Sequence, residues 1–239
     1  MRIILVGYGK MGRLIEETAV AAGDSVVGIF DETTIAALPE SDLQADVVID
    51  FSRPEGLDAV AAYVRRTGTA LVSGTTGYTQ EQKDRLASLG EQAPVLWSAN
   101  YSLGVAVLAK ALALVAGVLR PGFDVELTEI HHNQKVDAPS GTAKLLVQAL
   151  DSRQELTPVY GRAGDCGKRT PNEIGIHALR GGTVAGTHTV HFFGPDEELE
   201  FTHRAASRRI FVNGALAAAR KMVGRTNGLV TMDSLLFNA

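Results

Sequence analysis

The feature that most constrains the fold is a set of three glycines that directly follows an apolar run at the start of the chain. Arg2–Val6 is an apolar run of the kind found in strands that are covered on both faces. Gly7, Gly9 and Gly12 follow it, and a helical pattern over Met11–Ala22 begins among them. A strand, a glycine-rich turn and a helix in this order predict a βαβ unit and a parallel sheet.

Each glycine in this turn has its own physical reason. Gly7 permits the tight turn, Gly9 lets the backbone approach a pyrophosphate, and Gly12 lets the helix pack on the strand. Unpaired N–H groups at the start of the helix then bind the phosphate, helped by the helix dipole. The turn predicts a dinucleotide-binding loop, with a plain tight turn as the alternative. The residues that we expect to form this loop are Gly7, Tyr8, Gly9, Lys10, Met11 and Gly12.

An acidic residue follows at the distance that a dinucleotide site requires. Asp31 comes 19 residues after the third glycine and ends the predicted strand Ser25–Phe30, where a carboxylate accepts hydrogen bonds from the adenosine ribose. Asp31 and Glu32 would repel a 2′-phosphate, whereas Lys10 and Arg13 could pair with one. We therefore predict that NADH is used well and NADPH is tolerated. The alternatives are a turn-initiating carboxylate at Asp31 and solvated cations on the helix.

Strand and helix patterns alternate up to about residue 100, which predicts an α/β fold with an open, doubly wound parallel sheet. The predicted strands are Arg2–Val6, Ser25–Phe30, Asp46–Asp50, Thr69–Val72 and Pro94–Leu96. The predicted helices between them are Met11–Ala22, Pro54–Thr67 and Thr79–Leu89.

Two more loops follow the fourth and fifth predicted strands. Ligands of open α/β sheets bind outside the carboxyl ends of the strands, so both loops belong to the same crevice as the glycine turn. We expect their backbone and hydroxyl groups to hold the nicotinamide end of the cofactor, although ordinary turns would have similar composition. The residues concerned are Gly74, Thr75 and Thr76 in the first loop, and Ser98, Ala99, Asn100 and Tyr101 in the second.

The pattern changes near residue 100, where a long helix is predicted over Ser102–Leu119. A strand with one polar face and a helix beginning near Pro139 and Ser140 come next, and Gln154–Thr170 reads as a surface loop. Three further strands follow this loop with no helices between them, and together with the first strand they predict an α+β part with an antiparallel or mixed sheet. The predicted strands are Phe123–Ile130, Glu173–Leu179, Val184–Phe193 and Leu199–Ala205.

The Ala-rich helical segment Arg209–Met222 resembles the first part of the chain more than the second. We therefore expect residues 1–102 together with 209–239 to form a dinucleotide-binding domain. Residues 103–208 would then form a domain for substrate binding and oligomerisation.

Composition excludes several classes of protein. The net charge of −4 argues against a general nucleic-acid binder, which is usually basic. The one cysteine, Cys166, can form neither a disulfide within the chain nor a thiolate metal cluster, so a cytoplasmic location is the default expectation. The first apolar run is too short for a signal peptide. The longest apolar stretch, Leu103–Leu119, contains Lys110 and predicts a buried helix rather than a membrane span.

The segment from Glu129 to Lys144 is the most informative part of the sequence. A predicted strand ends in His131 and His132, and Lys135 follows four residues after His131. A helix then begins, and its first residues offer N–H groups and hydroxyls that bind anions. Positive charge, a proton source and an anion-binding helix end together suit a small acidic substrate that is protonated during the reaction. The helix-start residues concerned are Ser140, Gly141 and Thr142.

Other interpretations of these histidines stay open. A histidine pair at a strand end is often a surface feature, and the Pro-Ser-Gly-Thr run can be a helix start alone. Zinc bound by both histidines and Asp137 is awkward, because adjacent residues of a strand point to opposite faces. We interpret the remaining histidines as structural; they are His177, His188, His191 and His203.

The segment Glu129–Ala143 resembles throughout the signature of the dihydrodipicolinate reductases, also called 4-hydroxy-tetrahydrodipicolinate reductases. The other motifs fall in the order of that family, so the resemblance covers nearly the whole chain. Only the tail Asn227–Ala239 and the loop Gln154–Thr170 match loosely. The other matching motifs are Gly7–Gly12, Gly74–Gly77, Ser98–Ser102, Arg180–Gly186 and Phe211–Leu216.

The resemblance implies a Rossmann-type domain completed by C-terminal residues and a mixed-sheet domain that forms a homotetramer, in the cytoplasm. It implies reduction of a cyclic dicarboxylate, 4-hydroxy-tetrahydrodipicolinate, by NADH or NADPH in lysine biosynthesis. His131 would be the acid/base residue and Lys135 the proton donor. The substrate would be held by His132, Lys135, Ser140, Gly141 and Thr142, and no metal is implied.

Two competing functions remain at this point. Another two-domain dehydrogenase, acting on an amino-acid-derived aldehyde or imine, would share the cofactor half but would not need two histidines and Lys135 together. A dinucleotide-sensing module would bind NADH without oxidising it. The density of proton-transfer residues beside an anion site argues against that second alternative.

Overall fold

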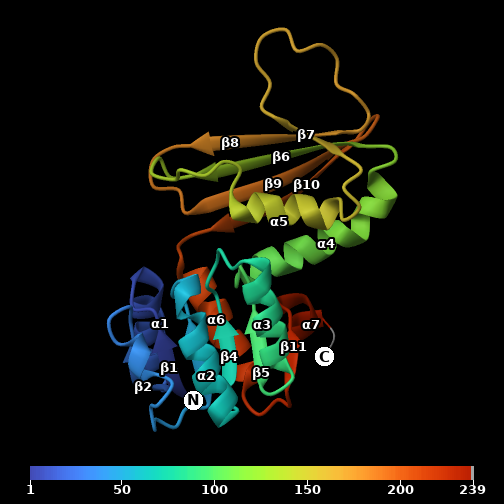
Figure 1. The fold of residues 1–239 in the computed structure, drawn as a ribbon. Helices are drawn as coiled ribbons and strands as arrows, with labels where there is room; N and C mark the ends of the chain where they lie inside the picture. Colours follow the sequence, from blue (N-terminus) through green and yellow to red (C-terminus); the bar gives the residue numbers. More distant parts are fainter. Residues whose placement is uncertain (238–239) are drawn as a thin grey trace. The chain divides into compact units, whose positions relative to one another are not determined.

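The computed structural model describes residues 1–237, which form two compact units (Figure 1). Unit 1 consists of Met1–Ser102 together with the C-terminal residues from Arg209 onward. Unit 2 consists of Leu103–Arg208. Among the described residues, no helix is both long and apolar enough to cross a membrane.

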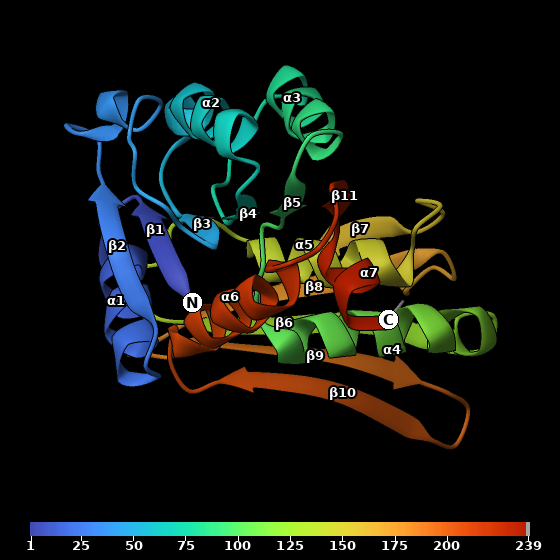
Figure 2. The same ribbon diagram turned by 90° about the horizontal axis from the view of Figure 1, so that it is seen from below.

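Unit 1 is built on a six-stranded sheet with the strand order β11-β5-β4-β3-β1-β2, in which every pair is parallel. Helices cover both of its faces, with α1 and α6 on one side and α2 and α3 on the other (Figure 2). The strands are β1 (Arg2–Val6), β2 (Ser25–Phe30), β3 (Val47–Asp50), β4 (Ala70–Ser73), β5 (Pro94–Trp97) and β11 (Gly228–Val230). The α-helices are α1 (Lys10–Ala21), α2 (Leu57–Thr67), α3 (Gln80–Gly90), α6 (Arg209–Met222) and α7 (Met232–Phe237), and two short 3-10 helices span Ile35–Ala37 and Pro54–Gly56.

The double covering explains why the inner strands are apolar except at end residues such as Arg2, Asp50 and Ser73. In β1, Ile3 and Leu5 pack into the core beneath α1 and α6, whereas Ile4 and Val6 pack into the core beneath α2 and α3. Successive side chains of a strand point to opposite faces, so both sets must be apolar when both faces are covered. The predicted doubly wound α/β sheet is therefore confirmed. The short strand β11 and helix α7 were not predicted.

Unit 2 is a five-stranded mixed sheet with the order β10-β9-β6-β8-β7. The pairs β6–β8 and β7–β8 are parallel, and β6–β9 and β9–β10 are antiparallel. Helices α4 and α5 pack on one face and enclose the core of this unit (Figure 1). The elements are α4 (Leu103–Leu119), β6 (Asp124–His131), α5 (Gly141–Leu150), β7 (Thr157–Tyr160), β8 (Glu173–Arg180), β9 (Gly186–Phe193) and β10 (Glu198–Ala205).

The predicted mixed sheet is confirmed, but two details of the sequence analysis were wrong. The segment Gln154–Thr170 is not entirely a loop, because β7 lies within it and pairs with β8. This edge strand is mostly exposed and contains Pro158, so it lacks the apolar pattern of an inner strand. The strand predicted from Val184 begins instead at Gly186.

Candidate active site

In unit 1 the glycine turn has the geometry that its spacing predicts. Gly7 has φ of +87°, and a Cβ atom there would lie 2.4 Å from the Phe51 carbonyl oxygen. A Cβ atom on Gly12 would lie 2.1 Å from the carbonyl oxygen of Gly7. Gly9 has open space where its Cβ would be. The first and third glycines thus permit close backbone packing, and the second leaves room above the amino end of α1.

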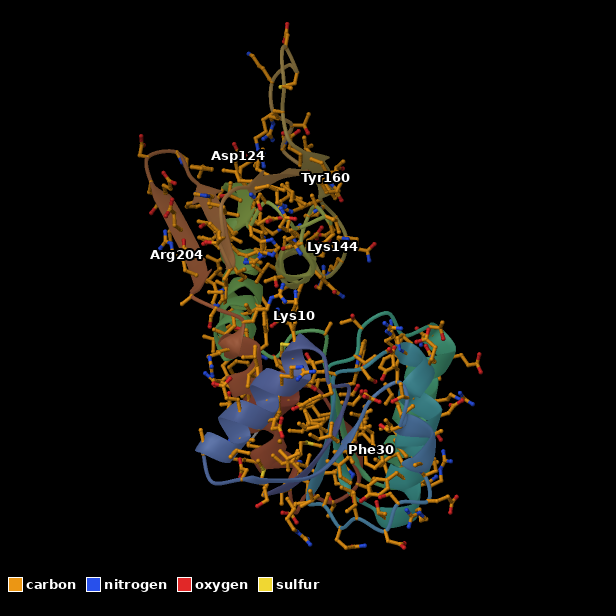
Figure 3. All side chains as sticks on the ribbon, turned by 90° about the vertical axis from the view of Figure 1, so that its left-hand side faces the viewer. Lys10, Phe30, Asp124, Lys144, Tyr160 and Arg204 are labelled. Atoms are coloured by element: carbon orange, nitrogen blue, oxygen red, sulfur yellow. The ribbon has the colours of Figure 1, made fainter. Side chains whose placement is uncertain are left out.

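A cavity of about 560 Å³ opens beside this turn. Loops that follow β1, β2 and β3 line it, as expected for a ligand site at the carboxyl ends of parallel strands. Of the predicted cofactor residues, the cavity brings together Gly7, Tyr8, Gly9 and Asp31. Lys10 lies at the amino end of α1 (Figure 3) and does not line the cavity. The cavity is also lined by Glu32, which the sequence analysis expected to repel a 2′-phosphate. Its other lining residues were not assigned to the cofactor from sequence; they are Thr33, Ile35, Phe51, Ser52, Arg53, Glu55 and Gly56.

Asp31 stabilises the turn after β2 through only one of its two carboxylate oxygens. Its Oδ1 accepts hydrogen bonds from the backbone N–H groups and the hydroxyls of Thr33 and Thr34. Within residues 1–237, Oδ2 has no hydrogen-bond partner. Hydrogen bonds from Thr33 and Thr34 hold the pKa of Asp31 below its usual value, so the group is charged at neutral pH. The turn-forming role and a ribose-binding role are thus compatible in one side chain.

The two remaining cofactor loops turn several of their side chains inward. The Thr75 hydroxyl is buried and donates to Asp50, and Tyr101 is 1% exposed with its hydroxyl donating to the Ser73 carbonyl. Gly74 packs against the Phe51 ring, where a Cβ would lie 2.2 Å away. Thr75 and Tyr101 can therefore offer a ligand only their backbone groups. Thr76 and Ala99 are exposed, and Gly74, Ser98 and Asn100 are half-buried.

In unit 2 the predicted site is organised around a buried carboxylate. Glu129 on β6 is fully buried, and its Oε2 lies 2.6 Å from Nδ1 of His131. Both terminal nitrogens of Arg180 donate to Glu129 at 2.8 Å, and the Ser140 N–H donates at 3.0 Å. Burial would raise the pKa of Glu129, but the hydrogen bonds from Arg180, His131 and Ser140 outweigh it and hold the pKa below its usual value. The carboxylate therefore fixes the orientation of His131.

His188 on β9 completes this cluster. Its ring lies edge-on to His131 with 5.1 Å between centroids, and its Nε2 is 2.9 Å from the Ser140 hydroxyl. The same hydroxyl accepts the Ala143 N–H and so caps α5. Burial and then the nearby charge of His131 lower the pKa of His188 to about 4. The sequence analysis assigned His188 a structural role, whereas the structure places it in contact with the two site residues.

This environment makes the stability of the protein depend on pH. In the unfolded chain the His188 imidazole is protonated below about pH 6.5, whereas in the folded chain it is protonated only near pH 4. The free energy of unfolding should therefore fall as pH is lowered from 6.5 to 4, by at most about 3 kcal/mol from this group. Urea unfolding of wild type and His188→Asn at pH 7 and pH 5 measures the difference. The variant should lose less stability than wild type when the pH is lowered from 7 to 5.

Lys135 lies in the loop after β6. Its Nζ is 2.7 Å from Oδ1 of Asp137, and its side chain is 20% exposed. This ion pair lowers the pKa of Asp137. Arg180 donates to the Asp137 carbonyl oxygen as well as to Glu129, which ties the loop to the buried carboxylate.

The substrate-binding residues of the prediction lie around this cluster in different settings. His132 and Thr142 are half-buried, Gly141 is exposed, and Ser140 is buried as the N-cap of α5. Lys144 follows on the first turn of α5 (Figure 3). The structure thus collects His131, Lys135 and Ser140 around elements β6 and α5 of one unit.

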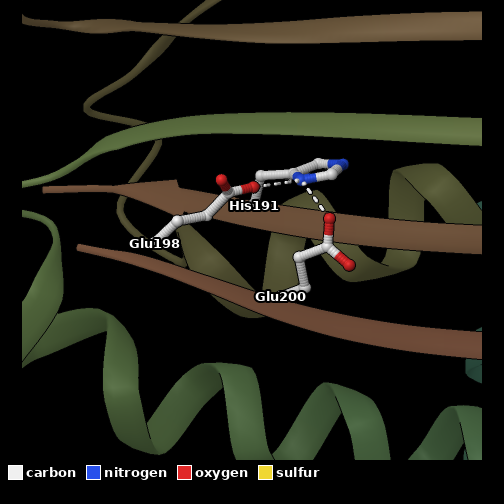
Figure 4. A group of neighbouring side chains, drawn as sticks. All are labelled: His191, Glu198 and Glu200. Atoms are coloured by element: carbon white, nitrogen blue, oxygen red, sulfur yellow. Dashed lines mark hydrogen bonds and ion pairs between the residues drawn. The ribbon is translucent and has the colours of Figure 1, made fainter.

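The face of the unit 2 sheet that α4 and α5 do not cover carries a separate cluster of His191, Glu198 and Glu200. His191 on β9 has its Nδ1 3.4 Å from Glu198 and 3.2 Å from Glu200 (Figure 4). Its Nε2 lies 3.0 Å from the Thr128 hydroxyl, and its ring stacks on Phe193. These are cross-strand contacts between β9 and β10, and both carboxylates are about half exposed to solvent.

Comparison with known proteins decides the family. The model of the dihydrodipicolinate reductase N-terminus matches residues 1–101, and the model of its C-terminus matches residues 104–236. The chain belongs to the dihydrodipicolinate reductase family. The predicted resemblance is thereby confirmed.

Individual members of the dihydrodipicolinate reductase family agree with this assignment. The chain is 43% identical over 239 residues to the 4-hydroxy-tetrahydrodipicolinate reductase of an Exiguobacterium species, covering 98% of this chain and 95% of that one. It is also 43% identical over 243 residues to the enzyme of Staphylococcus aureus, covering 98% and 100%. The dipicolinate-bound dihydrodipicolinate reductase from Paenisporosarcina has the same fold, with a TM-score of 0.77, 23% identity and 97% coverage of both chains.

Proposed function

We propose that this chain catalyses the reduction of 4-hydroxy-tetrahydrodipicolinate to tetrahydrodipicolinate by NADH or NADPH, a step of diaminopimelate and lysine biosynthesis. The observation that carries the proposal is 43% identity over 98% of the chain to proteins named for that activity. The cluster of Glu129, His131 and Arg180 supports it, because a site that protonates an anionic substrate needs fixed positive charge and an oriented acid.

In this proposal unit 1 binds the nucleotide. The pyrophosphate lies on Gly7–Gly12, the adenosine ribose bonds to the unoccupied Oδ2 of Asp31, and the nicotinamide end reaches the loops Gly74–Thr76 and Ser98–Tyr101. The cavity beside Gly7 and Asp31 supports the first two placements. The inward side chains of Thr75 and Tyr101 mean that backbone groups make the last contacts.

Unit 2 would bind and protonate the substrate. The helix start Ser140–Thr142 binds one carboxylate through backbone N–H groups, His132 contributes a hydrogen-bonding ring nitrogen and Lys135 contributes its ammonium. When bound, the reduced nicotinamide supplies the hydride. An enamine-like anion develops on the substrate as hydride arrives, and the Lys135 ammonium supplies the proton. His131, oriented by Glu129, is placed to act as the acid for loss of the substrate hydroxyl.

We further infer a cytoplasmic homotetramer assembled through unit 2. The support for assembly is that α4 and α5 cover only one face of its sheet. The opposite face carries polar and charged residues, including Thr128, His191 and Glu200. Cys166 is exposed as a free thiol, which suits a reducing compartment.

A coupled assay tests the proposed function. A synthase condenses aspartate semialdehyde with pyruvate, and the loss of reduced-nicotinamide absorbance is followed after adding this protein. We expect turnover with both cofactors and faster turnover with NADH, because the Asp31 carboxylate repels a 2′-phosphate. Binding of NADH without oxidation would favour the sensing module, and turnover only with other aldehydes or imines would favour a different dehydrogenase. A large kinetic preference for NADPH would argue against the role of Asp31.

A further inference from the structure

A second buried carboxylate lies in unit 1, at the end of β3. Asp50 is 1% exposed and accepts five hydrogen bonds. Its Oδ1 accepts the N–H of Ser52 at 3.0 Å and the Ser52 hydroxyl at 2.5 Å. Its Oδ2 accepts the hydroxyls of Ser73 at 2.8 Å, Thr75 at 2.9 Å and Tyr78 at 3.2 Å. Both oxygens therefore act as acceptors, as in an ionised carboxylate.

No cationic side chain in residues 1–237 forms an ion pair with Asp50. All of its partners are neutral hydroxyls and one N–H group, so its negative charge is solvated by dipoles rather than cancelled. The charge affects its neighbours: burial and then Asp50 raise the pKa of both Tyr78 and Tyr101. A buried charge without a counter-ion is costly to keep, which suggests that a ligand uses it.

Asp50 joins two loops that the cofactor proposal uses. Ser52 lines the 560 Å³ cavity, and the Thr75 hydroxyl accepts the Ser52 N–H at 3.0 Å while donating to Asp50. The Gly74 N–H donates to the Asp50 carbonyl oxygen. The Thr75 carbonyl in turn accepts the indole N–H of Trp97 at 2.9 Å. Asp50 thus fixes the loop after β3 against the loop after β4.

We propose that Asp50 is a positioning residue whose uncancelled charge favours the oxidised, cationic nicotinamide ring over the neutral reduced ring. This inference rests on the proposed function, in which the nicotinamide end reaches Gly74–Thr76. Loss of hydride gives the ring a positive charge, and a fixed negative charge in a low-dielectric interior stabilises it. The same interaction lowers the barrier, because the charge develops during hydride transfer.

Asp50→Asn tests the inference, because the amide has nearly the same shape without the charge. Trp97 is the only tryptophan, so energy transfer from it to bound NADH measures the NADH affinity, and displacement of NADH measures that of NAD⁺. We expect Asp50→Asn to weaken NAD⁺ about tenfold more than NADH and to lower kcat by a similar factor. A merely structural role would weaken both nucleotides in the same proportion, and that result would overturn the inference.

Tyr78→Phe is the matched control, since it removes one hydrogen bond to Asp50 and keeps the charge. Its ratio of NAD⁺ to NADH affinity should equal that of wild type, and a change as large as that of Asp50→Asn would contradict the inference.

A measurement on the wild-type protein tests the inference if Asp50→Asn does not fold. Wild type should bind NAD⁺ more tightly than ADP-ribose, which lacks the nicotinamide ring. Weaker binding of NAD⁺ would overturn the proposed role of Asp50. Wild-type turnover in the coupled assay reports separately on the proposed function.

Discussion

Replacing Lys135 with Ala should lower kcat by about 10²- to 10⁴-fold, the range that a general acid contributes. The variant leaves no ammonium in the loop after β6 to protonate the anion formed by hydride transfer. Its affinity for NADH should stay at the wild-type value, because the proposed nucleotide residues all lie in unit 1. Steady-state kinetics in the coupled assay and NADH titration by Trp97 energy transfer measure the two quantities.

Asp137→Asn provides the control for Lys135→Ala. It removes the ion pair with Lys135 but keeps the ammonium, so its kcat should fall far less. Near-normal turnover of Lys135→Ala would reject the proton-donor role. An equal loss in both variants would instead indicate that the ion pair, rather than the proton, is what the reaction needs.

Glu129→Gln should both destabilise unit 2 and slow the reaction. Breaking a buried ion pair leaves the Arg180 charge without its partner, which costs about 3 kcal/mol of unfolding free energy. His131 also loses the acceptor that fixes its Nδ1, and we expect kcat to fall on the order of 10²-fold. Urea unfolding followed by circular dichroism reports the whole chain, whereas Trp97 fluorescence reports unit 1, so the two together locate the loss.

The double variant Glu129→Gln/Arg180→Met separates the two effects. Removing the stranded cation should restore much of the stability and none of the activity. If Glu129→Gln alone kept wild-type kcat, the orienting role of the carboxylate would be rejected. If Glu129→Gln alone kept the wild-type free energy of unfolding, the Glu129–Arg180 ion pair would make no net contribution to stability.

The arrangement of the sheets followed from sequence because their inner strands are strongly patterned. β1 is apolar at every buried position and β3 at all but its last, Asp50, whereas β6 alternates, with Val125, Leu127 and Glu129 all on its buried face. The two missed strands lack such a pattern. β7 is an exposed edge strand, and β11 has only three residues, so pairing with a neighbour rather than local composition defines both.

The candidate site was predictable where its residues are close in sequence. The glycine spacing and the segment from His131 to Thr142 carry their own signal, but Arg180 lies 51 residues from Glu129, and only the β6–β8 pairing brings them together. Glu129 itself had a signal that went unused. It is a charged residue at an inward position of an alternating strand, which requires a buried partner.

The discontinuity of unit 1 has a consequence for biosynthesis. The first face of its sheet is covered partly by α6, whose residues Val212, Leu216 and Met222 are buried in that core, and Gly214 packs directly on the Tyr101 carbonyl. A nascent chain that has emerged from the ribosome only as far as Ser102 therefore has a parallel sheet with one face covered by α1 alone and the remainder of that apolar surface exposed. We expect unit 1 to stay incompletely folded and accessible to chaperones until the hundred or so intervening residues (Leu103–Arg208) and then α6 have been translated. Helix α6 can then pack on the exposed part of the sheet.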